Sequence, residues 1–190
     1  MSMELYANEL KNYRQLNEVA RANGVVLFGS TFAKNIPVSE LKQDFELDCN
    51  IYNRSLTDLS VFDAASVLDD CVINLAPEKV LIQLGETDLE SGFKSISEIV
   101  AQYELIISHI HSRLKKCEIT LISVCDPDAS LYPEELNAQL KVLAEKNGCQ
   151  YADIYPVLAN EAPAVKAFYL LKRFFRGRLS EYDALNMRFA

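Results

Sequence analysis

The sequence predicts an α/β fold built around a parallel β-sheet, and two observations favour it. Short apolar runs alternate along the chain with segments in which apolar residues recur at helical spacing. Such alternation is typical of β-α-β units, whose helices cover both faces of the sheet. Hydroxyl and carboxyl side chains also gather directly after the apolar runs. We therefore expect one domain over residues 1–190, a three-layer α/β/α sandwich with about five parallel strands in flavodoxin-like order.

The expected strands are five short apolar runs. Three of them consist almost entirely of apolar residues, which is typical of strands that are buried on both faces: Val25–Gly29, Lys79–Gly85 and Glu118–Val124. Residues Asp48–Tyr52 and Tyr151–Tyr155 form weaker strand patterns.

The expected helices lie before, between and after these strands. Apolar residues recur at helical spacing in three segments, Leu5–Ala22, Val61–Leu75 and Pro133–Lys146. A fourth segment, Phe93–Leu114, carries the clearest apolar stripe. A basic helical segment begins at about Ala164 and completes the chain.

The composition excludes several classes of protein. The formal net charge of −8 argues against a nucleic-acid-binding surface. No run approaches the ~20 apolar residues of a membrane span, and the N-terminus lacks the apolar segment of a signal peptide. The five cysteines form neither a CxxC motif nor a cysteine–histidine pattern. We therefore expect reduced thiols, a cytoplasmic location and no bound metal.

The charge is unevenly distributed along the chain. From Lys166 to the end there are six Lys or Arg residues and two acids, so this tail carries +4 and the rest carries −12. One interpretation of the tail is a solvated basic helix face. The other is a site for an anion or a partner.

The loops after the expected strands carry the candidate functional residues. In parallel sheets, ligands bind at the carboxyl ends of the strands. The residues at these ends are Ser30-Thr31, Asn53-Arg54-Ser55, Glu86-Thr87-Asp88 and Asp126. The stretch FGSTFAKN lacks the glycines of a dinucleotide-binding turn and the Lys-Ser/Thr pair of a P-loop, so we expect no cofactor.

The same loops resemble those of the SGNH/GDSL hydrolase family in order and spacing. FGST, at Phe28–Thr31, matches the family's FGDS after its first strand. YNRS, at Tyr52–Ser55, matches NRG after the second, and LGETD, at Leu84–Asp88, matches GxND after the third. Residues Leu136–Leu158 are similar to the stretch that runs through the last strand. The resemblance covers nearly the whole chain and implies a flavodoxin-like sheet related to esterases, acylhydrolases and lysophospholipases.

The family's chemistry gives each matching position an expected role. A serine attacks an acyl carbonyl, a histidine takes its proton, and an aspartate orients the histidine. The serine amide, a glycine amide and an asparagine side chain donate hydrogen bonds to the oxyanion. By resemblance, the nucleophile position falls on Thr31, and the three oxyanion positions fall on Thr31, Ser55 and Thr87.

The chain departs from the family at each hallmark position. Thr31 replaces the nucleophilic serine, and Ser30 replaces the aspartate before it. Ser30 is itself the nucleophile if the turn differs by one residue. Ser55 replaces the glycine but keeps an amide that can donate, and Thr87 replaces the asparagine with a shorter donor.

The sequence offers no general base in the family's position. The terminal DxxH corresponds best to Arg176-Gly177-Arg178-Leu179, which contains neither Asp nor His. The chain's two histidines, His109 and His111, lie near the end of a helix that a right-handed crossover returns to the opposite edge of the sheet. If Arg176 and Arg178 fill the vacated space, the site favours anions.

The remaining polar residues at the strand ends each have two interpretations. Arg54, Glu86 and Asp88 either contact a ligand or stabilise their loops, and the two carboxylates are also candidate bases. Asp126 and Asp128, in DPDAS, are typical of a turn, with a catalytic role as the alternative.

We therefore expect an SGNH/GDSL-hydrolase-like protein that is impaired in catalysis. Such a protein binds a small acyl, sugar or lipid-like ligand, or a partner, at the ancestral site. The alternative is an active esterase or acylhydrolase that uses Thr31 or Ser30 with an unusual base, either an acidic side chain or a residue of a neighbouring subunit. A carboxyl or imidazole group within about 3.2 Å of either hydroxyl favours the alternative. Homo-oligomer formation is left open.

Overall fold

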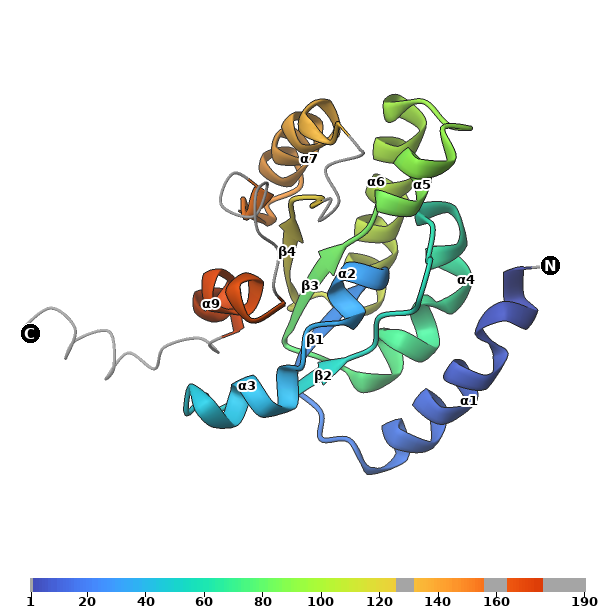
Figure 1. The fold of residues 1–190 in the computed structure, drawn as a ribbon. Coiled ribbons are helices and arrows are strands. Elements are labelled where there is room, and N and C mark those ends of the chain that lie inside the picture. The colour runs from blue at the N-terminus through green and yellow to red at the C-terminus, as the bar shows by residue number, and fades with distance from the viewer. Residues whose placement is uncertain (1, 126–131, 156–163, 176–190) are drawn as a thin grey trace, which may run out of the picture.

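A five-stranded parallel sheet forms the centre of the protein. The structure, a computed structural model, describes residues 2–125, 132–155 and 164–175 (Figure 1). The strand order is β2-β1-β3-β4-β5, and every pair is parallel. The strands are β1 (Val25–Gly29), β2 (Ile51–Asn53), β3 (Lys79–Gln83), β4 (Glu118–Ile122) and β5 (Gln150–Ala152). This is the flavodoxin-like order, so the predicted fold class is confirmed.

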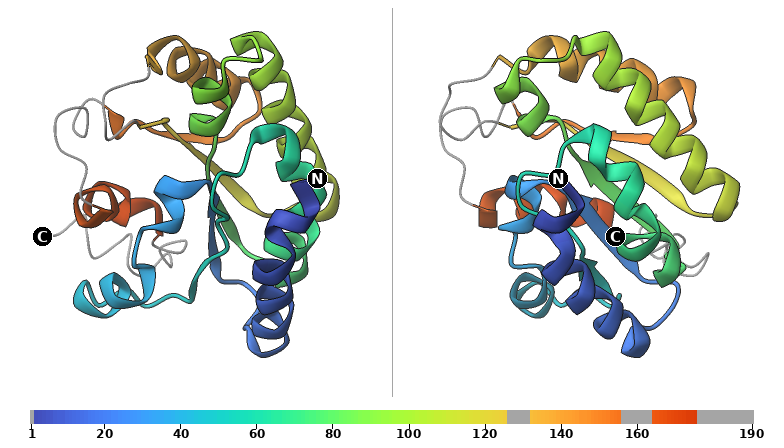
Figure 2. Two further views of the ribbon diagram at one scale, coloured as in Figure 1. Left: turned by 45° about the vertical axis from the view of Figure 1, so that its right-hand side comes forward. Right: turned by 90° about the vertical axis from the view of Figure 1, so that its right-hand side faces the viewer.

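Helices cover both faces of the sheet and complete three layers (Figure 2). The helices of one face are α1 (Ser2–Val19), α4 (Val61–Cys71), α6 (Ile96–Arg113) and α7 (Glu134–Lys146). The helices of the other face are α2 (Thr31–Lys34), α3 (Val38–Asp44) and α9 (Ala164–Phe175). Two short connections, the 3-10 turn η1 (Ile73–Leu75) and α5 (Glu86–Ser91), flank β3.

Each strand divides its side chains between two hydrophobic cores. In β1, Val26 and Phe28 join the core under α1, α4, α6 and α7, whereas Val25 and Leu27 join the core under α2, α3 and α9. This alternation follows from the two-residue period of a strand. Because both faces are covered, β1 and β3 are buried along their whole length, which explains their continuous apolar sequences.

Several element boundaries differ from those that the sequence predicts. Helix α6 begins at Ile96, after a capping box made by Ser95 and Glu98. Phe93 was expected on the apolar stripe of this helix, but it lies before the cap and is 88% exposed. Helices α2, α3 and α5 were not predicted, because elements of four to seven residues are too short to show a periodic pattern.

Gly29 allows the ends of β1 and β3 to approach closely. A Cβ atom at this position would lie 2.2 Å from the carbonyl oxygen of Gln83, a distance that only glycine avoids. The next residue, Ser30, donates its amide to the same carbonyl at 3.1 Å. The sheet therefore fixes the backbone of Ser30 directly beside the carboxyl end of β3.

The described residues contain neither a candidate membrane span nor a candidate metal site. No helix within residues 2–125, 132–155 and 164–175 is both long and apolar enough to cross a membrane. Within the same ranges, no three His, Cys, Asp or Glu side chains are grouped so that they could hold a metal ion.

Candidate functional site

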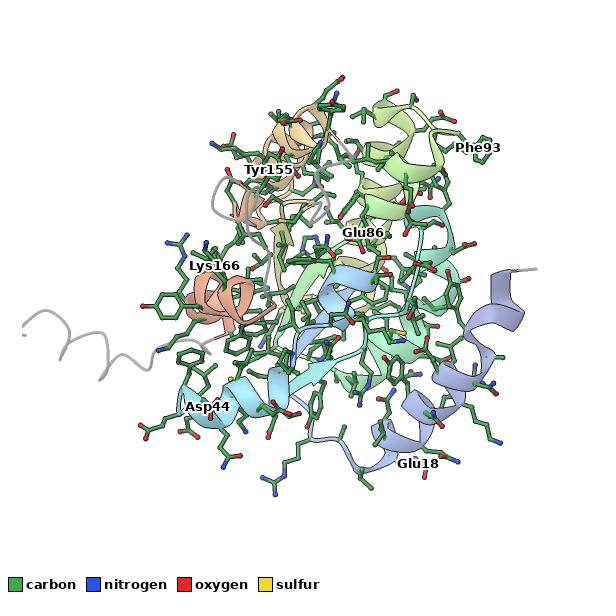
Figure 3. The ribbon with its side chains drawn as sticks, viewed as in Figure 1. Glu18, Asp44, Glu86, Phe93, Tyr155 and Lys166 are labelled. Carbon is green, nitrogen blue, oxygen red and sulfur yellow. The ribbon has the colours of Figure 1, made fainter. Side chains whose placement is uncertain are left out.

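The carboxyl ends of β1 and β3 bring four of the expected site residues together. Ser30 is fully buried, and its Oγ lies 3.1 Å from Oγ1 of Thr87 in α5. Glu86 stands one residue before Thr87 and lies beside α2 in the centre of the molecule (Figure 3). Thr31 opens α2 and is partly exposed. We call Ser30, Thr31, Glu86 and Thr87 the strand-end cluster.

Glu86 supplies the carboxyl group of the cluster, and hydrogen bonds hold both of its oxygens. Its Oε1 accepts a hydrogen bond from the Phe32 amide at 2.9 Å, and its Oε2 accepts one from Nε2 of Gln83 at 2.9 Å. Burial raises the pKa of this carboxyl group, and the hydrogen bonds from Phe32, Gln83 and Ser30 partly offset the rise. The cluster thus contains a desolvated carboxyl group whose two oxygens are held by Phe32 and Gln83.

Gln83 contributes a polar atom without a partner. This last residue of β3 is fully buried, and its Oε1 accepts no hydrogen bond within the described part of the chain. A buried acceptor left without a donor costs about 1–3 kcal/mol, so such atoms are rare in folded proteins. The side chain of Gln83 lies beside Glu86, so its free acceptor belongs to the same polar region as the cluster.

Thr31 forms a closed pair with Asp58, which lies in the loop after β2. The Thr31 hydroxyl donates to Oδ1 of Asp58 at 2.9 Å, and the Asp58 amide donates back to the same hydroxyl oxygen at 2.9 Å. An acidic group therefore lies within the distance that a general base requires. The reciprocal bonds also tie the start of α2 to the loop after β2.

Ser55 does not present its amide to the cluster. The sequence left this amide able to donate to an oxyanion, but it donates to Oδ1 of Asn53 at 3.1 Å. The side-chain nitrogen Nδ2 of Asn53 donates in turn to the carbonyl oxygens of Ala33, Lys34 and Ile36, which lie in and just after α2. Asn53 thus fixes the loop after β2.

Arg54 is buried against α1 on the far side of the same loop. Its guanidinium lies over the rings of Tyr13 and Tyr52, at 5.1 and 5.4 Å from their centroids. Its Nε donates to Oδ1 of Asn17 at 3.0 Å, and burial lowers its pKa. These contacts hold α1 against the sheet. They explain why the guanidinium is buried at this position, and no ligand is needed for that explanation.

Asp88 stabilises a helix rather than facing the cluster. Its Oδ2 accepts the amide of Val61, the first residue of α4, at 2.9 Å. A carboxylate at this position satisfies one of the amides that a helix leaves free at its start. Burial raises the pKa of Asp88, as it does for Glu86.

The thiols near the sheet are poor replacements for a hydroxyl nucleophile. Cys125 follows β4 at the carboxyl edge, and burial raises its pKa to about 12. Burial likewise raises the pKa of each other cysteine: Cys49, Cys71, Cys117 and Cys149. Because the thiolate is the reactive form, these side chains are unreactive at neutral pH.

Both histidines lie at the opposite edge of the sheet, as predicted from the crossover. Nε2 of His109 lies 3.5 Å from Asp69 near the end of α4, and His111 lines a surface hollow with Lys116 and Cys117 before β4. The expected site residues Asp126, Asp128, Arg176 and Arg178 lie outside the described residues.

Sequence reasoning missed Asp58, Gln83 and the role of Asn137. A polar residue inside the apolar run KVLIQLG was a usable signal for Gln83. Asn137, in α7, is buried, with Oδ1 accepting the Val124 amide at 2.7 Å and Nδ2 donating to the Val124 carbonyl at 3.0 Å. Nothing local marks Asp58, because only the fold brings it to Thr31.

Comparison with known proteins gives matches in structure alone. No protein-family model matches this sequence, and no curated protein matches it either. A candidate platelet activating factor from Streptococcus pneumonia has a similar structure, with a TM-score of 0.78 and 16% identity over 91% of this chain and 94% of that one.

Two further solved structures have the same architecture. A GDSL-like lipase from Bacteroides thetaiotaomicron matches with a TM-score of 0.70 and 16% identity, over 87% of this chain and 96% of its own. A catalytic mutant of the acetylxylan esterase Axe2 from Geobacillus stearothermophilus matches with a TM-score of 0.63 and 16% identity, over 82% and 93% of the two chains. The present chain therefore has the fold of the SGNH/GDSL hydrolases.

Proposed function

We propose that this protein binds a small, hydroxyl-rich ligand, such as a sugar or polyol, at the strand-end cluster and does not hydrolyse esters. The observation that carries the proposal is that groups at the family's catalytic positions are already hydrogen-bonded within the chain. The Ser55 amide is held by Asn53, the Thr87 hydroxyl by Ser30, and the Thr31 hydroxyl by Asp58.

The nature of the ligand follows from the acceptors of the cluster. The Glu86 carboxyl group accepts hydrogen bonds, and Oε1 of Gln83 is a buried acceptor that has no donor among the described residues. Asp58 adds a second, exposed carboxyl group at the edge of the cluster. A ligand that offers several hydroxyl donors satisfies such a surface, because buried acceptors need partners.

An ester-hydrolysis assay tests the catalytic part of the proposal. Purified wild-type protein and a Ser30→Ala, Thr31→Ala double variant are incubated with p-nitrophenyl acetate and butyrate, with an acetylxylan esterase of the same fold as positive control. We expect the wild type to release no more p-nitrophenol than the double variant. Turnover that disappears in the double variant would overturn the proposal.

A binding assay tests the ligand part. Thermal unfolding is followed with N-acetylglucosamine, xylose and glycerol as probes, and we expect at least one of them to raise the midpoint for the wild type. Replacing Glu86 by Gln removes an ionisable acceptor and is expected to abolish the increase. The matched control is Glu90→Gln, an exposed residue of the same helix. Equal loss in both variants, or no increase for any probe, contradicts binding at the cluster.

Ester hydrolysis is a second candidate function, and one observation favours it. Oδ1 of Asp58 lies 2.9 Å from the Thr31 hydroxyl, within reach for proton transfer. Against it, the Asp58 side chain is exposed to solvent, whereas catalytic sites generally exclude water from the reacting groups. If the assay detects turnover, Asp58→Asn and Glu86→Gln then identify whether Thr31 or Ser30 is the nucleophile.

A further inference from the structure

A cavity lies at the amino edge of the sheet, on the side opposite the strand-end cluster. It has a volume of about 550 Å³, within the range of small-molecule sites. Three segments enclose it: Asn23 before β1, residues 76–79 at the start of β3, and residues 113–118 between α6 and β4. None of these residues belongs to the strand-end cluster or to the loops that carry it.

This cavity concentrates positive charge in an acidic protein. Its lining includes the four cations Lys79, Arg113, Lys115 and Lys116 and the two acids Glu78 and Glu118. The local excess is therefore positive, whereas the whole chain has a formal net charge of −8. Such a local reversal of sign draws anions to one place on the surface.

The cations of the cavity differ in whether they have acidic partners. Nζ of Lys79 lies 3.4 Å from Glu118, and Nη1 of Arg113 lies 3.8 Å from Asp69. Lys115 and Lys116 are exposed and form no ion pair with any residue of the described segments. These two adjacent ammonium groups repel each other, and a bound anion would relieve the repulsion.

The two lysines border a second hollow as well. This hollow has a volume of about 470 Å³ and shares Lys115, Lys116 and Glu118 with the first. It adds His111 from the last turn of α6. A ligand with two or more anionic groups can therefore engage the same lysines from both sides of the turn.

One residue that lines the cavity, Ala76, has an unfavourable backbone conformation. Asn23 and Ala76 both have positive φ, of 60° and 42°, and the Asn23 amide donates to the Ala76 carbonyl at 3.0 Å. For a residue such as alanine, this region is disfavoured by steric contact with Cβ. Strain of this kind clusters at binding sites, where the fold maintains a particular shape.

We propose that the amino-edge cavity binds a compact polyanion, a small molecule with two or more phosphate or carboxylate groups, through Lys115 and Lys116. This site is separate from the strand-end cluster, so it stands or falls independently of the proposed function. The size of the cavity and the acidic remainder of the chain disfavour nucleic acid as the ligand.

Calorimetric titration with pyrophosphate and with citrate tests the proposal. Titration with sodium chloride at matched ionic strength corrects for screening. We expect pyrophosphate to bind the wild-type protein and to bind the Lys115→Glu, Lys116→Glu variant at least about tenfold more weakly, because each lost cation removes a charge-assisted contact. Equal binding of citrate identifies a general polyanion site, and preference for pyrophosphate identifies a phosphate site; either result supports the proposal.

A matched variant separates a local site from general charge effects. Lys11→Glu, Lys141→Glu changes the net charge equally at exposed positions on α1 and α7. We expect this control to bind pyrophosphate as the wild type does, and circular dichroism checks that both variants fold. If the charge-reversed pair unfolds, Lys115→Ala, Lys116→Ala replaces it. No binding to the wild type, or equal weakening in the control, overturns the proposal.

Discussion

The polar groups at the two edges of the sheet differ in whether they have partners within the described residues. At the carboxyl edge, Ser30, Thr31 and Thr87 form hydrogen bonds with one another or with neighbouring loops. At the amino edge, Lys115 and Lys116 stand beside a hollow without an acidic partner in the segments that the structure describes. The hydroxyl groups at the carboxyl edge are thus bonded within the chain, although Oε1 of Gln83 has no donor there among the described residues. Within the same described segments, two lysines at the amino edge have no acidic partner.

This difference teaches that a resemblance in fold does not locate a ligand site by itself. Ser30, Thr31 and Thr87 lie at the carboxyl ends of β1 and β3, but their hydroxyl groups form hydrogen bonds with other groups of the chain. Function depends on the groups of a site rather than on the architecture that holds them. Substitutions at each edge test how much its contacts contribute to the free energy of unfolding, and the largest effect is expected at Gly29.

Replacing Gly29 by Ala should cause the largest loss of stability. The new Cβ would meet the Gln83 carbonyl at 2.2 Å and the Ala33 Cβ at 2.7 Å, so β1 and β3 must separate. We expect the free energy of unfolding to fall by about 4 kcal/mol, or the protein not to fold. Urea unfolding measures the change. Gly92→Ala is the control, since it has positive φ but no neighbour within 4 Å and should cost only about 1 kcal/mol. Equal costs would show that the close approach at the carboxyl edge is not required.

Replacing Asn137 by Ala should be the next most costly change. It leaves the buried amide and carbonyl of Val124 without partners at the end of β4. We expect a loss of about 2–3 kcal/mol, since each unsatisfied buried group carries a desolvation cost. Thermal or urea unfolding measures it against Gln139→Ala on the same helix. A cost no larger than that of the control would mean that water readily replaces Asn137.

Replacing Glu86 by Gln should change how stability depends on pH. The ordinary pKa of Glu is 4.5, and burial holds the pKa of Glu86 above it in the folded protein. Between these two values the folded chain binds more protons than the unfolded chain, so the contribution of Glu86 is present at low pH and is lost as pH rises through its folded pKa. The Gln variant cannot ionise. The difference in unfolding free energy, variant minus wild type, should therefore increase from pH 4.5 towards neutrality.

Urea unfolding at a series of pH values gives this difference directly. The exposed Glu90→Gln variant is the control, and its difference from wild type should stay nearly constant over the same range. A constant difference for Glu86→Gln as well would show that its carboxyl group is solvated in the folded state.

Replacing Ala76 by Gly should have the smallest effect, and its sign is opposite. Glycine adopts the φ of 42° without steric cost, but it also gains freedom in the unfolded chain. We expect a net stabilisation of about 0.5 kcal/mol. The control is Ala101→Gly, in the exposed middle of α6, which should destabilise by about 1 kcal/mol. If Ala76→Gly destabilises as much as the control, the amino edge is not strained.

The sequence predicted the fold well because its signals are periodic and repeated. Both Val25–Gly29 and Lys79–Gln83 are apolar runs buried on two faces, and the alternation with helices determines a parallel sheet. Boundaries were less accurate where one residue decided them. Phe93 extended the apolar stripe of α6 in sequence, but the capping box at Ser95 begins the helix after it.

The site was predicted only in its position along the chain. Motif spacing placed Ser30, Thr31 and Thr87 at the strand ends, but spacing contains no information on which side chains bond to one another. The contacts Thr31–Asp58 and Gln83–Glu86 depend on how the loops after β2 and β3 turn towards α2. The amino-edge cavity was also invisible, because three segments far apart in sequence meet there.

The buried thiols can report when each layer of the protein opens. Cys71 belongs to the core on one face of the sheet, and Cys125 belongs to the core on the other. Each becomes accessible, and recovers the acidity of a thiol in water, only when its own face opens. The rate of alkylation at each cysteine, read by mass spectrometry, would thus time the opening of the two layers separately without any added label.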